Sequence, residues 1–215
     1  MKLYVYDHCP YCVKARMIFG LKNIPFEMIT LLNDDEETPI SMIGQKMAPI
    51  LEKDNGNCMP ESMDIVHYVD ESFGKPVLAG KTNPAIADWL RDVSSYLNQL
   101  LIPRYAKAEF AEFCTPSARA YFTKKKEAAI GSFAQHLENT PALKARLEED
   151  LQKLDALIQS PEACNGELSI DDIHLFPSLR GMSIVKDVRY PAKVDAYRKT
   201  MSKRSGVNLL DAIAQ

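Results

Sequence analysis

The residues with the clearest chemical potential are two cysteines near the N-terminus, in the segment Cys9-Pro10-Tyr11-Cys12. An apolar run precedes the segment and a helical pattern follows it, which places Cys9 at a helix N-terminus. The unpaired N–H groups and the positive end of the helix dipole favour a thiolate there. Such a position can lower a cysteine pKa from about 8.5 to between roughly 3.5 and 7.5. Cys12 follows one turn later, so we predict a redox-active dithiol with Cys9 as the nucleophile.

A Cys-x-x-Cys segment also occurs as half of a zinc site, and this alternative needs to be weighed. Structural zinc takes four ligands, usually from a second Cys-x-x-Cys or from two histidines at regular spacing. The remaining cysteines and the histidines are scattered singly along the chain: Cys58, Cys114, Cys164, His8, His67, His136 and His174. The sequence therefore favours redox chemistry and predicts no metal site.

The composition is that of an ordinary globular protein of 215 residues, with 46% hydrophobic and 26% charged residues. Its net charge of −3 argues against nonspecific binding to nucleic acid, which requires a basic surface. No stretch approaches the roughly 18 apolar residues of a membrane span, and nothing at the N-terminus resembles a signal peptide. Five cysteines without a framework pattern point to a reducing compartment. We expect a cytoplasmic protein that binds neither nucleic acid nor membranes.

Residues 1–72 alternate between strand and helix patterns. Asp54-Asn55-Gly56 predicts a hairpin turn between two short strands. A Thr38-Pro39 pair predicts one helix start, and Ser62 is expected to be the N-cap of another. The expected strands cover 2–6, 26–31, 49–52 and 57–59, and the first helix covers 10–21. The order β-α-β-α-β-β-α is that of a thioredoxin-like domain.

Residues 73–83 read as a linker rich in glycine, proline and lysine, and residues 84–215 carry only helical patterns. Pro103 is expected to end or kink the first of these helices. The helix that Pro116 opens is expected to run on to Leu137. Ser169 and Asp172 have the spacing of a capping box, with Asp in place of Glu. Helix starts are expected at Asn83-Pro84, Thr115-Pro116, Thr140-Pro141, Ser169 and Pro191.

Several of these motifs, taken in order, resemble one family. Cys9-Pro10-Tyr11-Cys12 resembles the active site of dithiol glutaredoxins, and Ala48-Pro49 before a strand resembles the cis-proline position of thioredoxin-like folds. Pro60-Glu61-Ser62 resembles the element by which glutathione transferases hold the γ-glutamyl end of glutathione. The helical second half, with its Ser169-x-x-Asp172 box, resembles the C-terminal transferase domain. The whole chain is thus similar to the two-domain bacterial glutaredoxins.

The resemblance implies an α/β thioredoxin-like domain followed by an all-α, glutathione-transferase-like domain. It also implies a glutathione-dependent oxidoreductase that reduces protein disulfides and glutathione mixed disulfides. Glutathione would be a reducing co-substrate with no tightly bound cofactor, the partners would be disulfide-bonded or glutathionylated proteins, and we expect a monomer. The implied catalytic residues are Cys9 and Cys12, and the implied glutathione-binding residues are Cys9, Tyr11, Ala48, Pro49, Glu61 and Ser62.

The chain also departs from the pattern of this family. Ala48 stands where a β-branched valine is more usual, and Asp7-His8 stands where short glutaredoxins often carry a basic residue. The field on the Cys9 thiolate is therefore expected to come mostly from the helix terminus, with His8 as a residue of the strand end. Lys22 and Lys46 are candidates for the group that holds the glycine carboxylate of glutathione.

Three alternative functions share these features. A glutathione transferase that conjugates electrophiles has the same fold, but it does not need the second cysteine. A non-catalytic binding module of transferase fold would not need either cysteine. An iron–sulfur cluster bridged between two chains through Cys9 is the third alternative, and Pro10 after the first cysteine makes it less favourable.

Overall fold

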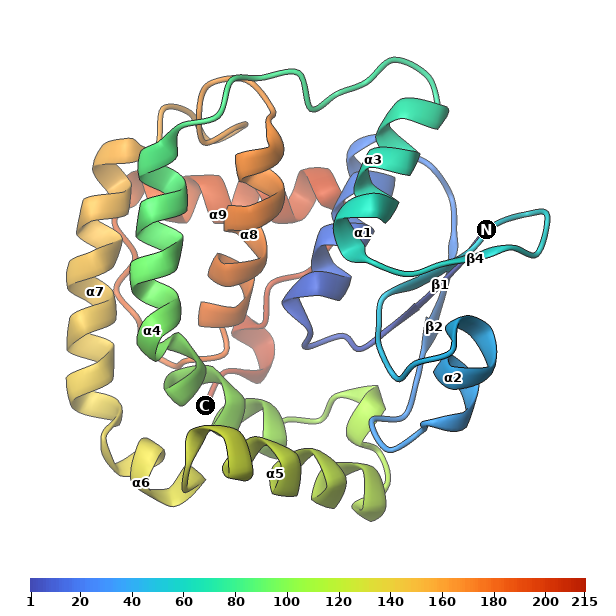
Figure 1. Cartoon of the computed structure of the whole chain (residues 1–215). Coiled ribbons are helices and arrows are strands. Elements are labelled where there is room, and N and C mark those ends of the chain that lie inside the picture. Colours follow the sequence, from blue (N-terminus) through green and yellow to red (C-terminus); the bar gives the residue numbers. More distant parts are fainter.

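The computed structural model describes all 215 residues, in an α/β half followed by a helical half. Figure 1 shows the sheet on one side of the molecule and the helical half on the other. The α/β half contains β1 (Lys2–Val5), α1 (Pro10–Leu21), β2 (Glu27–Thr30), α2 (Glu37–Ile43), β3 (Ile50–Glu52), β4 (Cys58–Met59) and α3 (Ser62–Ser72). The predicted order β-α-β-α-β-β-α is confirmed.

The four strands form one mixed sheet in the order β2-β1-β3-β4. β1 pairs with β2 in parallel, as a strand–helix–strand unit requires, and β3 pairs antiparallel with both β1 and β4. In these registers Leu3 lies opposite Met28 on one side and Leu51 on the other. The hairpin turn between β3 and β4 places Gly56 at a φ of 82°, a conformation that glycine adopts without strain.

Two predicted helix starts in this half are wrong in detail. α2 begins at Glu37, one residue before Thr38, so Thr38 is not its cap. The Asp35 carboxylate, at Oδ1, accepts a hydrogen bond from the Thr38 N–H at 2.9 Å and fills this role from outside the helix. Ser62 is not an N-cap either, because it is the first residue of α3. Glu61 occupies the cap position, with a φ of 68°.

The helical half contains α4 (Pro84–Lys107), η1 (Ala111–Phe113), α5 (Pro116–Ile130), α6 (Phe133–Glu138), α7 (Thr140–Leu157), α8 (Ile170–Met182), α9 (Ala192–Ser205) and η2 (Asp211–Ile213). Two of the predicted caps are confirmed: Asn83 accepts from Ala85 N–H at 3.1 Å, and Thr115 accepts from Ala118 N–H at 3.2 Å. α4 continues through Pro103 and changes direction in its last turns (Figure 1).

The helix that Pro116 opens is shorter than expected. It ends at Ile130, because Gly131 takes a φ of 91° and interrupts the helix. The Ser132 side chain then caps a separate short helix, α6, by accepting from the Gln135 N–H at 3.5 Å. The apolar residues after Gly131 fit the same helical period, so periodicity alone did not reveal the break.

The capping box of α8 is confirmed, and its carboxylate has a second task. Asp172 is fully buried, and its Oδ2 accepts from the Ser169 N–H at 2.9 Å. Its Oδ1 accepts from the Cys164 N–H and from the Tyr197 hydroxyl, both at 2.8 Å. A buried carboxylate is tolerated only when it is well hydrogen-bonded, and these contacts satisfy that requirement while tying α8 to α9.

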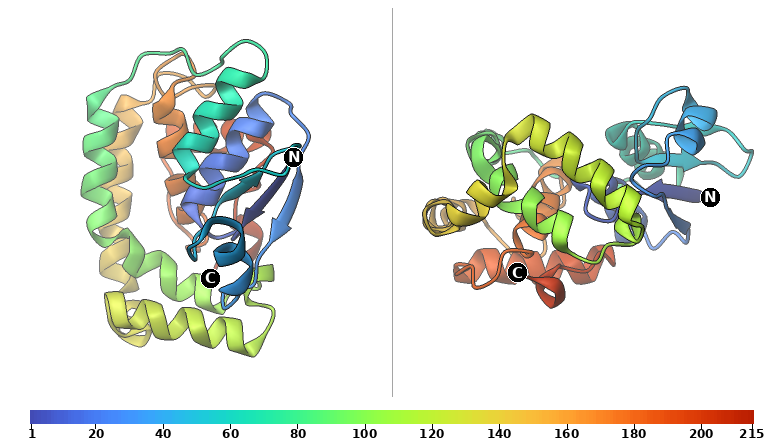
Figure 2. Two further views of the ribbon diagram at one scale, coloured as in Figure 1. Left: turned by 45° about the vertical axis from the view of Figure 1, so that its right-hand side comes forward. Right: turned by 90° about the horizontal axis from the view of Figure 1, so that it is seen from below.

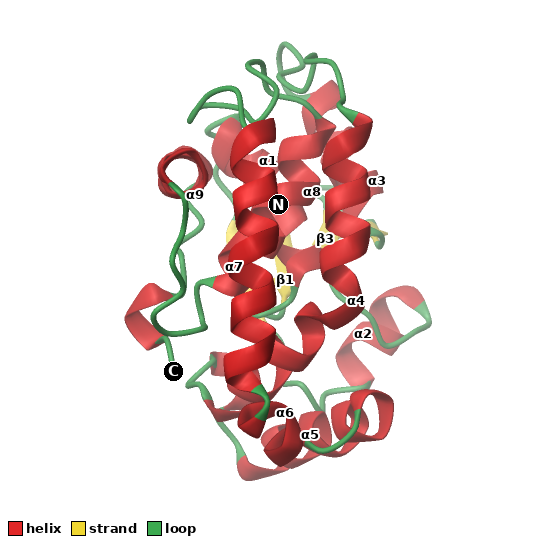
Figure 3. Cartoon of the chain, turned by 90° about the vertical axis from the view of Figure 1, so that its left-hand side faces the viewer, coloured by secondary structure: helices red, strands yellow, loops and turns green.

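The two halves share one continuous hydrophobic core. α1 and α3 lie between the sheet and the helical half (Figure 2), and Figure 3 shows the sheet behind the helices when the molecule is viewed from the helical side. Gly20 of α1 packs so closely on α9 that an added Cβ would lie 1.8 Å from the Ser205 carbonyl oxygen.

In none of the helices do length and apolarity together reach what a membrane crossing requires.

Candidate active site

The two cysteines lie where β1 leads into α1. Cys9 is the N-cap residue of α1, with an extended backbone (φ −74°, ψ 122°), and Pro10 is the first helical residue. Its fixed φ suits this place, where a missing N–H has no cost. Cys9 is partly exposed, whereas Cys12 is fully buried beneath it and accepts a hydrogen bond from the Tyr6 N–H at 3.4 Å. The first thiol is open to substrate and the second is shielded.

The environment separates the acidities of the two thiols. A hydrogen bond from Cys12 is the largest influence on Cys9 and lowers its pKa to about 6. Burial opposes this shift, while the charge of His8 and the N–H groups of Cys12 and Tyr11 support it. Burial and the neighbouring Cys9 raise the pKa of Cys12 well above its usual value. The expectation that the helix terminus provides most of the effect is wrong: the Cys12 thiol and the charge of His8 lower the Cys9 pKa more than the helix N–H groups do.

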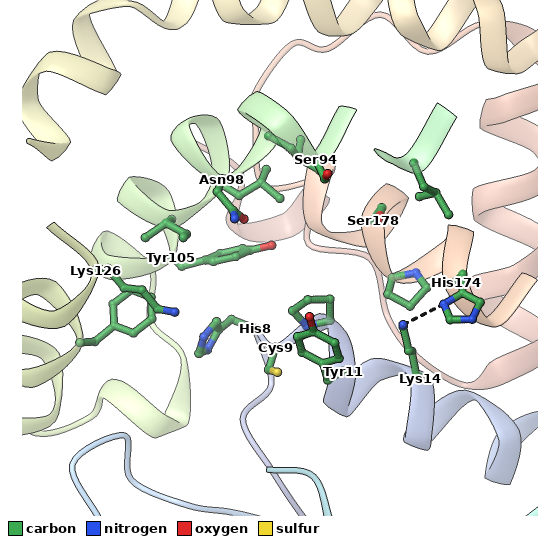
Figure 4. Close-up of a pocket in the computed structure, with 17 residues that line it drawn as sticks. His8, Cys9, Tyr11, Lys14, Ser94, Asn98, Tyr105, Lys126, His174 and Ser178 are labelled. Atoms are coloured by element: carbon green, nitrogen blue, oxygen red, sulfur yellow. Dashed lines mark hydrogen bonds between the residues drawn. The ribbon is translucent and has the colours of Figure 1, made fainter. Parts of the chain in front are cut away.

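Cys9 opens into a cleft of about 480 Å³ between the two halves. The loop before α1 and the first turns of α1 form one wall, and α4 and α8 form the other (Figure 4). Tyr11 lines the edge of the cleft and is 59% exposed, so the ring is accessible to a ligand. The apolar part of the lining comes from Leu90, Leu97, Leu101, Ile102, Tyr105 and Phe122.

The other predicted site residues lie at the same edge of the sheet as Cys9. The antiparallel register pairs Tyr4 with Ile50, which places Ala48-Pro49 beside the end of β1 that leads to Cys9. The Ala48–Pro49 peptide bond is cis, as the resemblance implied. β4 runs antiparallel to β3 and therefore ends at this edge too, which brings Glu61 and Ser62 there. The topology thus gathers all three motifs around one end of the sheet.

The start of α3 leaves polar groups available at this edge. Ser62 is buried, and the side chain of Glu61, the N-cap residue, makes no capping hydrogen bond. Glu61 is exposed. The first N–H groups of a helix lack intrahelical partners, and the dipole favours an anion near them. This corner suits a group that carries both an ammonium and a carboxylate.

The two lysines considered for the glycine carboxylate of glutathione have other partners. Lys22 is buried, and its Nζ donates to the Asp70 carboxylate at 3.1 Å and to the Asp70 and Lys75 carbonyls. This overturns Lys22 as a candidate. Lys46 Nζ donates to the Asn33 carbonyl at 2.6 Å, and it lies 3.9 Å from the centroid of the Tyr121 ring.

The sequence interpretation missed a contact between the halves that involves His8. The ring Nδ1 of His8 lies 2.7 Å from Oε1 of Glu112, and the same oxygen accepts from the His8 backbone N–H at 2.9 Å. His8 was visible beside Cys9, but Glu112 lies 104 residues away, in η1, and no local pattern marked it.

A second missed contact lies across the cleft. Lys14 Nζ of α1 lies 2.9 Å from His174 Nδ1 of α8, and both side chains line the cleft (Figure 4). Burial lowers the pKa of both groups, and the charge of Lys14 lowers that of His174 further. Both residues lie in the predicted helical patterns, but their contact depends on how the two halves dock.

The remaining cysteines lie apart from this site. Cys164 is buried and Cys58 partly buried, and burial raises the pKa of each thiol. Cys114 is exposed. No group of three or more histidine, cysteine or acidic side chains comes together in the structure as a metal-ion site would require.

Comparison with known proteins gives the same architecture. The family model for the N-terminal domain of glutathione S-transferases matches residues 3–77, and the model for the C-terminal domain of glutaredoxin 2 matches residues 85–214. Glutaredoxin 2 of Escherichia coli K12 is 58% identical over 214 residues, which covers 100% of both chains. The structure of glutaredoxin 2 from Salmonella typhimurium in complex with glutathione is 60% identical, with a TM-score of 0.99 over 100% of this chain and 98% of that one.

More distant structures share the fold alone. Gtt2 from Saccharomyces cerevisiae is 19% identical, with a TM-score of 0.56 over 99% of this chain and 100% of that one.

A thioredoxin-like domain with an acidic cysteine, joined to a transferase-like helical domain, defines a glutathione-dependent thiol–disulfide oxidoreductase. Within that class, this chain belongs to the glutaredoxin 2 family.

Proposed function

We propose that Cys9 is the nucleophile of this oxidoreductase, that Cys12 is the resolving thiol, and that glutathione is the physiological reductant. One observation carries the assignment. Cys9 lies at the mouth of the cleft with a pKa of about 6, while Cys12 is buried beneath it with a raised pKa. The thiolate is the attacking form, so at neutral pH Cys9 is ready to attack and Cys12 is not.

With a glutathionylated protein, the Cys9 thiolate attacks the glutathione sulfur. A Cys9–glutathione disulfide forms, and the protein sulfur leaves as a thiolate that takes up a proton. A second glutathione thiolate then attacks the glutathione sulfur of this mixed disulfide. Oxidised glutathione is released and Cys9 returns as a thiolate. Cys12 is not required in this sequence.

With a disulfide-bonded protein, Cys9 first forms a mixed disulfide with one of the two protein sulfurs. Cys12 then loses its proton and attacks the sulfur of Cys9, which releases the protein as a dithiol and leaves a Cys9–Cys12 disulfide. Two glutathione molecules reduce that disulfide and leave as oxidised glutathione. The buried position of Cys12 directly behind Cys9 supports this role, because it favours the internal attack over reaction with solvent thiols.

We infer that glutathione lies along the sheet edge between Cys9 and α3. Ala48, ahead of the cis Pro49, offers its backbone N–H and C=O to the cysteinyl part, in the manner of an added strand. The Ser62 hydroxyl and the N-terminus of α3 accommodate the γ-glutamyl carboxylate, and Glu61 accepts from the ammonium. Tyr11 packs beside the sulfur. The related structure from Salmonella typhimurium in complex with glutathione supports this inference.

The remaining parts of the proposal concern the cellular setting. We infer a cytoplasmic monomer without a tightly bound cofactor, whose partners are disulfide-bonded or glutathionylated proteins rather than nucleic acid or membranes. The net charge of −3 and the odd number of unpaired cysteines support this setting.

The deciding experiment is the reduction of a glutathionylated peptide by the purified chain, with glutathione as the only reductant. We expect turnover that depends on Cys9. A parallel assay with an aromatic electrophile tests the transferase alternative, and we expect little conjugation. Conjugation without peptide reduction would contradict the proposal.

A further inference from the structure

Glu112 is a fully buried carboxylate with unusual partners. Its Oε1 accepts two hydrogen bonds, and both come from His8: one from the backbone N–H and one from the ring. Its Oε2 is buried and has no partner in the protein. The Glu112 backbone oxygen accepts from the Asn33 N–H at 2.9 Å, which fixes η1 against the α/β half. His8 therefore provides every hydrogen bond that this carboxylate receives.

The surroundings leave His8 as the partner of this carboxylate. A buried carboxylate requires compensating partners, and no lysine or arginine forms an ion pair with Glu112. The His8 ring is only 10% exposed and is enclosed by aromatic rings, so Glu112 is the polar group that orients it. Centroid distances from the His8 ring run from 5.1 to 6.1 Å, to Tyr6, Tyr105, Phe110, Phe113 and Phe122.

His8 is also the residue next to Cys9, and both side chains line the same cleft (Figure 4). Three other titratable groups face Cys9 besides Cys12: Tyr6, Tyr105 and Lys14. Burial raises the pKa of both phenols, so they are neutral, and Lys14 contacts His174 across the cleft. Lys14 is thus a second cation that faces the sulfur, while His8 is the charged neighbour with the largest lowering effect on the Cys9 pKa.

Asp7, the residue before His8, is paired with Arg16 and Arg180, which is one carboxylate against two guanidinium groups. The carboxylate of Asp7 therefore has partners of its own and does not compete with Glu112 for His8.

We propose that Glu112 is a positioning residue for the thiol chemistry: it holds the His8 ring beside Cys9, and the charge of His8 stabilises the Cys9 thiolate. The proposal deepens the proposed function, since it rests on Cys9 being the nucleophile. It also gives the helical half a part in the chemistry of the α/β half. Glu112 itself touches neither substrate nor sulfur and acts only through His8.

The sign of the effect distinguishes this role from a structural one. Without Glu112, the His8 ring loses the contact that holds it beside Cys9, and the Cys9 pKa rises by about one unit. At a pH well below the Cys9 pKa of both proteins, this rise is about a tenfold loss of thiolate, and at high pH the loss disappears. Without His8, removal of the Glu112 charge takes away only a repulsion, so the Cys9 pKa falls or stays unchanged.

The experiment measures thiolate absorbance against pH in the full chain, without glutathione and without turnover, so it remains informative even if the proposed function fails. The variants are Glu112→Gln, His8→Gln and the double variant. Asp150→Asn is the matched control, because Asp150 is a buried carboxylate of the helical half that accepts from the Tyr96 hydroxyl at 2.9 Å and does not line the cleft. Cys12→Ser versions of each protein assign the titration to Cys9.

We expect Glu112→Gln and His8→Gln each to raise the Cys9 pKa. The double variant should raise this pKa no further than either single variant does, and the control should leave it unchanged. A rise on Glu112→Gln that persists in the His8→Gln background would overturn the proposal, as would no rise at all. Should Glu112→Gln not fold, His8→Gln decides, because an unchanged Cys9 pKa in that variant would also overturn the proposal.

Discussion

Arg180 on α8 holds Asp7, two residues before Cys9, with two hydrogen bonds: Nη1 donates to the Asp7 backbone oxygen at 2.7 Å and Nη2 to its carboxylate at 2.8 Å. The arginine is almost fully buried, and its Nε also donates to the Asn208 carbonyl at 2.8 Å. Burial alone would raise the pKa of Asp7, but the charges of Arg180 and Arg16 outweigh it and lower that pKa. The helical half therefore fixes the loop that carries Cys9.

Replacement of Arg180 by Met should destabilise the protein by about 2 kcal/mol, because it leaves the partly buried Asp7 with Arg16 alone. Urea unfolding measures the change. Arg189→Met is the matched control: Arg189 pairs with Glu148 but is 88% exposed, and its loss should destabilise the protein far less. Equal losses from the two variants would contradict a special role for the Arg180 pair.

Replacement of Cys12 by Ser should separate the two proposed reactions. Reduction of glutathionylated peptides should persist, because only Cys9 acts there, whereas reduction of protein disulfides should fall at least tenfold without the internal attack. Cys9→Ser should abolish both, and Cys164→Ser, at a buried thiol distant from the cleft, serves as the control. Parallel loss of both activities in Cys12→Ser would argue against this division.

The pH dependence of exchange should follow the ionisation of Cys9. With a pKa of about 6, the thiolate fraction is small below that value, rises through it, and is nearly complete above pH 7. The rate of reaction with a small neutral alkylating reagent should therefore increase with pH, with a midpoint near 6, and then level off. A midpoint above 8, typical of an unperturbed cysteine, would contradict the role of Cys12 and His8.

Replacement of Ser62 by Ala should weaken glutathione binding by about 1 kcal/mol, roughly fivefold in the dissociation constant, through loss of one hydrogen bond. Calorimetric titration of the Cys9→Ser background with glutathione measures it without turnover. Ser72→Ala, at the other end of α3, is the control. Unchanged affinity would remove Ser62 from the binding site.

The sequence predicted the elements better than it predicted their contacts. Strong local signals, such as Cys9 before Pro10 and the Ser169–Asp172 box, encode their own geometry, and both are found as expected. Thr38 and Ser62 were misassigned because residues outside the local pattern determine where α2 and α3 begin. These errors shift helix starts by one residue and leave the topology intact.

The contacts between the halves had no local signal. The Glu112–His8 pair joins residues 104 apart, and the Lys14–His174 pair joins residues 160 apart. Each depends on how two domains dock, which hydrophobic periodicity does not encode. Lys22 pairs with Asp70 of α3, 48 residues away within the α/β half, and no local pattern marked that contact either. The cysteine pair could therefore be found from the sequence, whereas the contacts of its neighbours with the helical half could not.

The shared core and the close approach of Gly20 to Ser205 also bear on what the connecting segment does. Residues 73–83 connect two halves that already pack against each other through the shared apolar core. This linker is therefore not what holds the two halves together. A protease that severed it would produce two fragments that remain associated without a covalent bond. Neither fragment would dissolve well alone, because each would present to water the side chains that the other now covers.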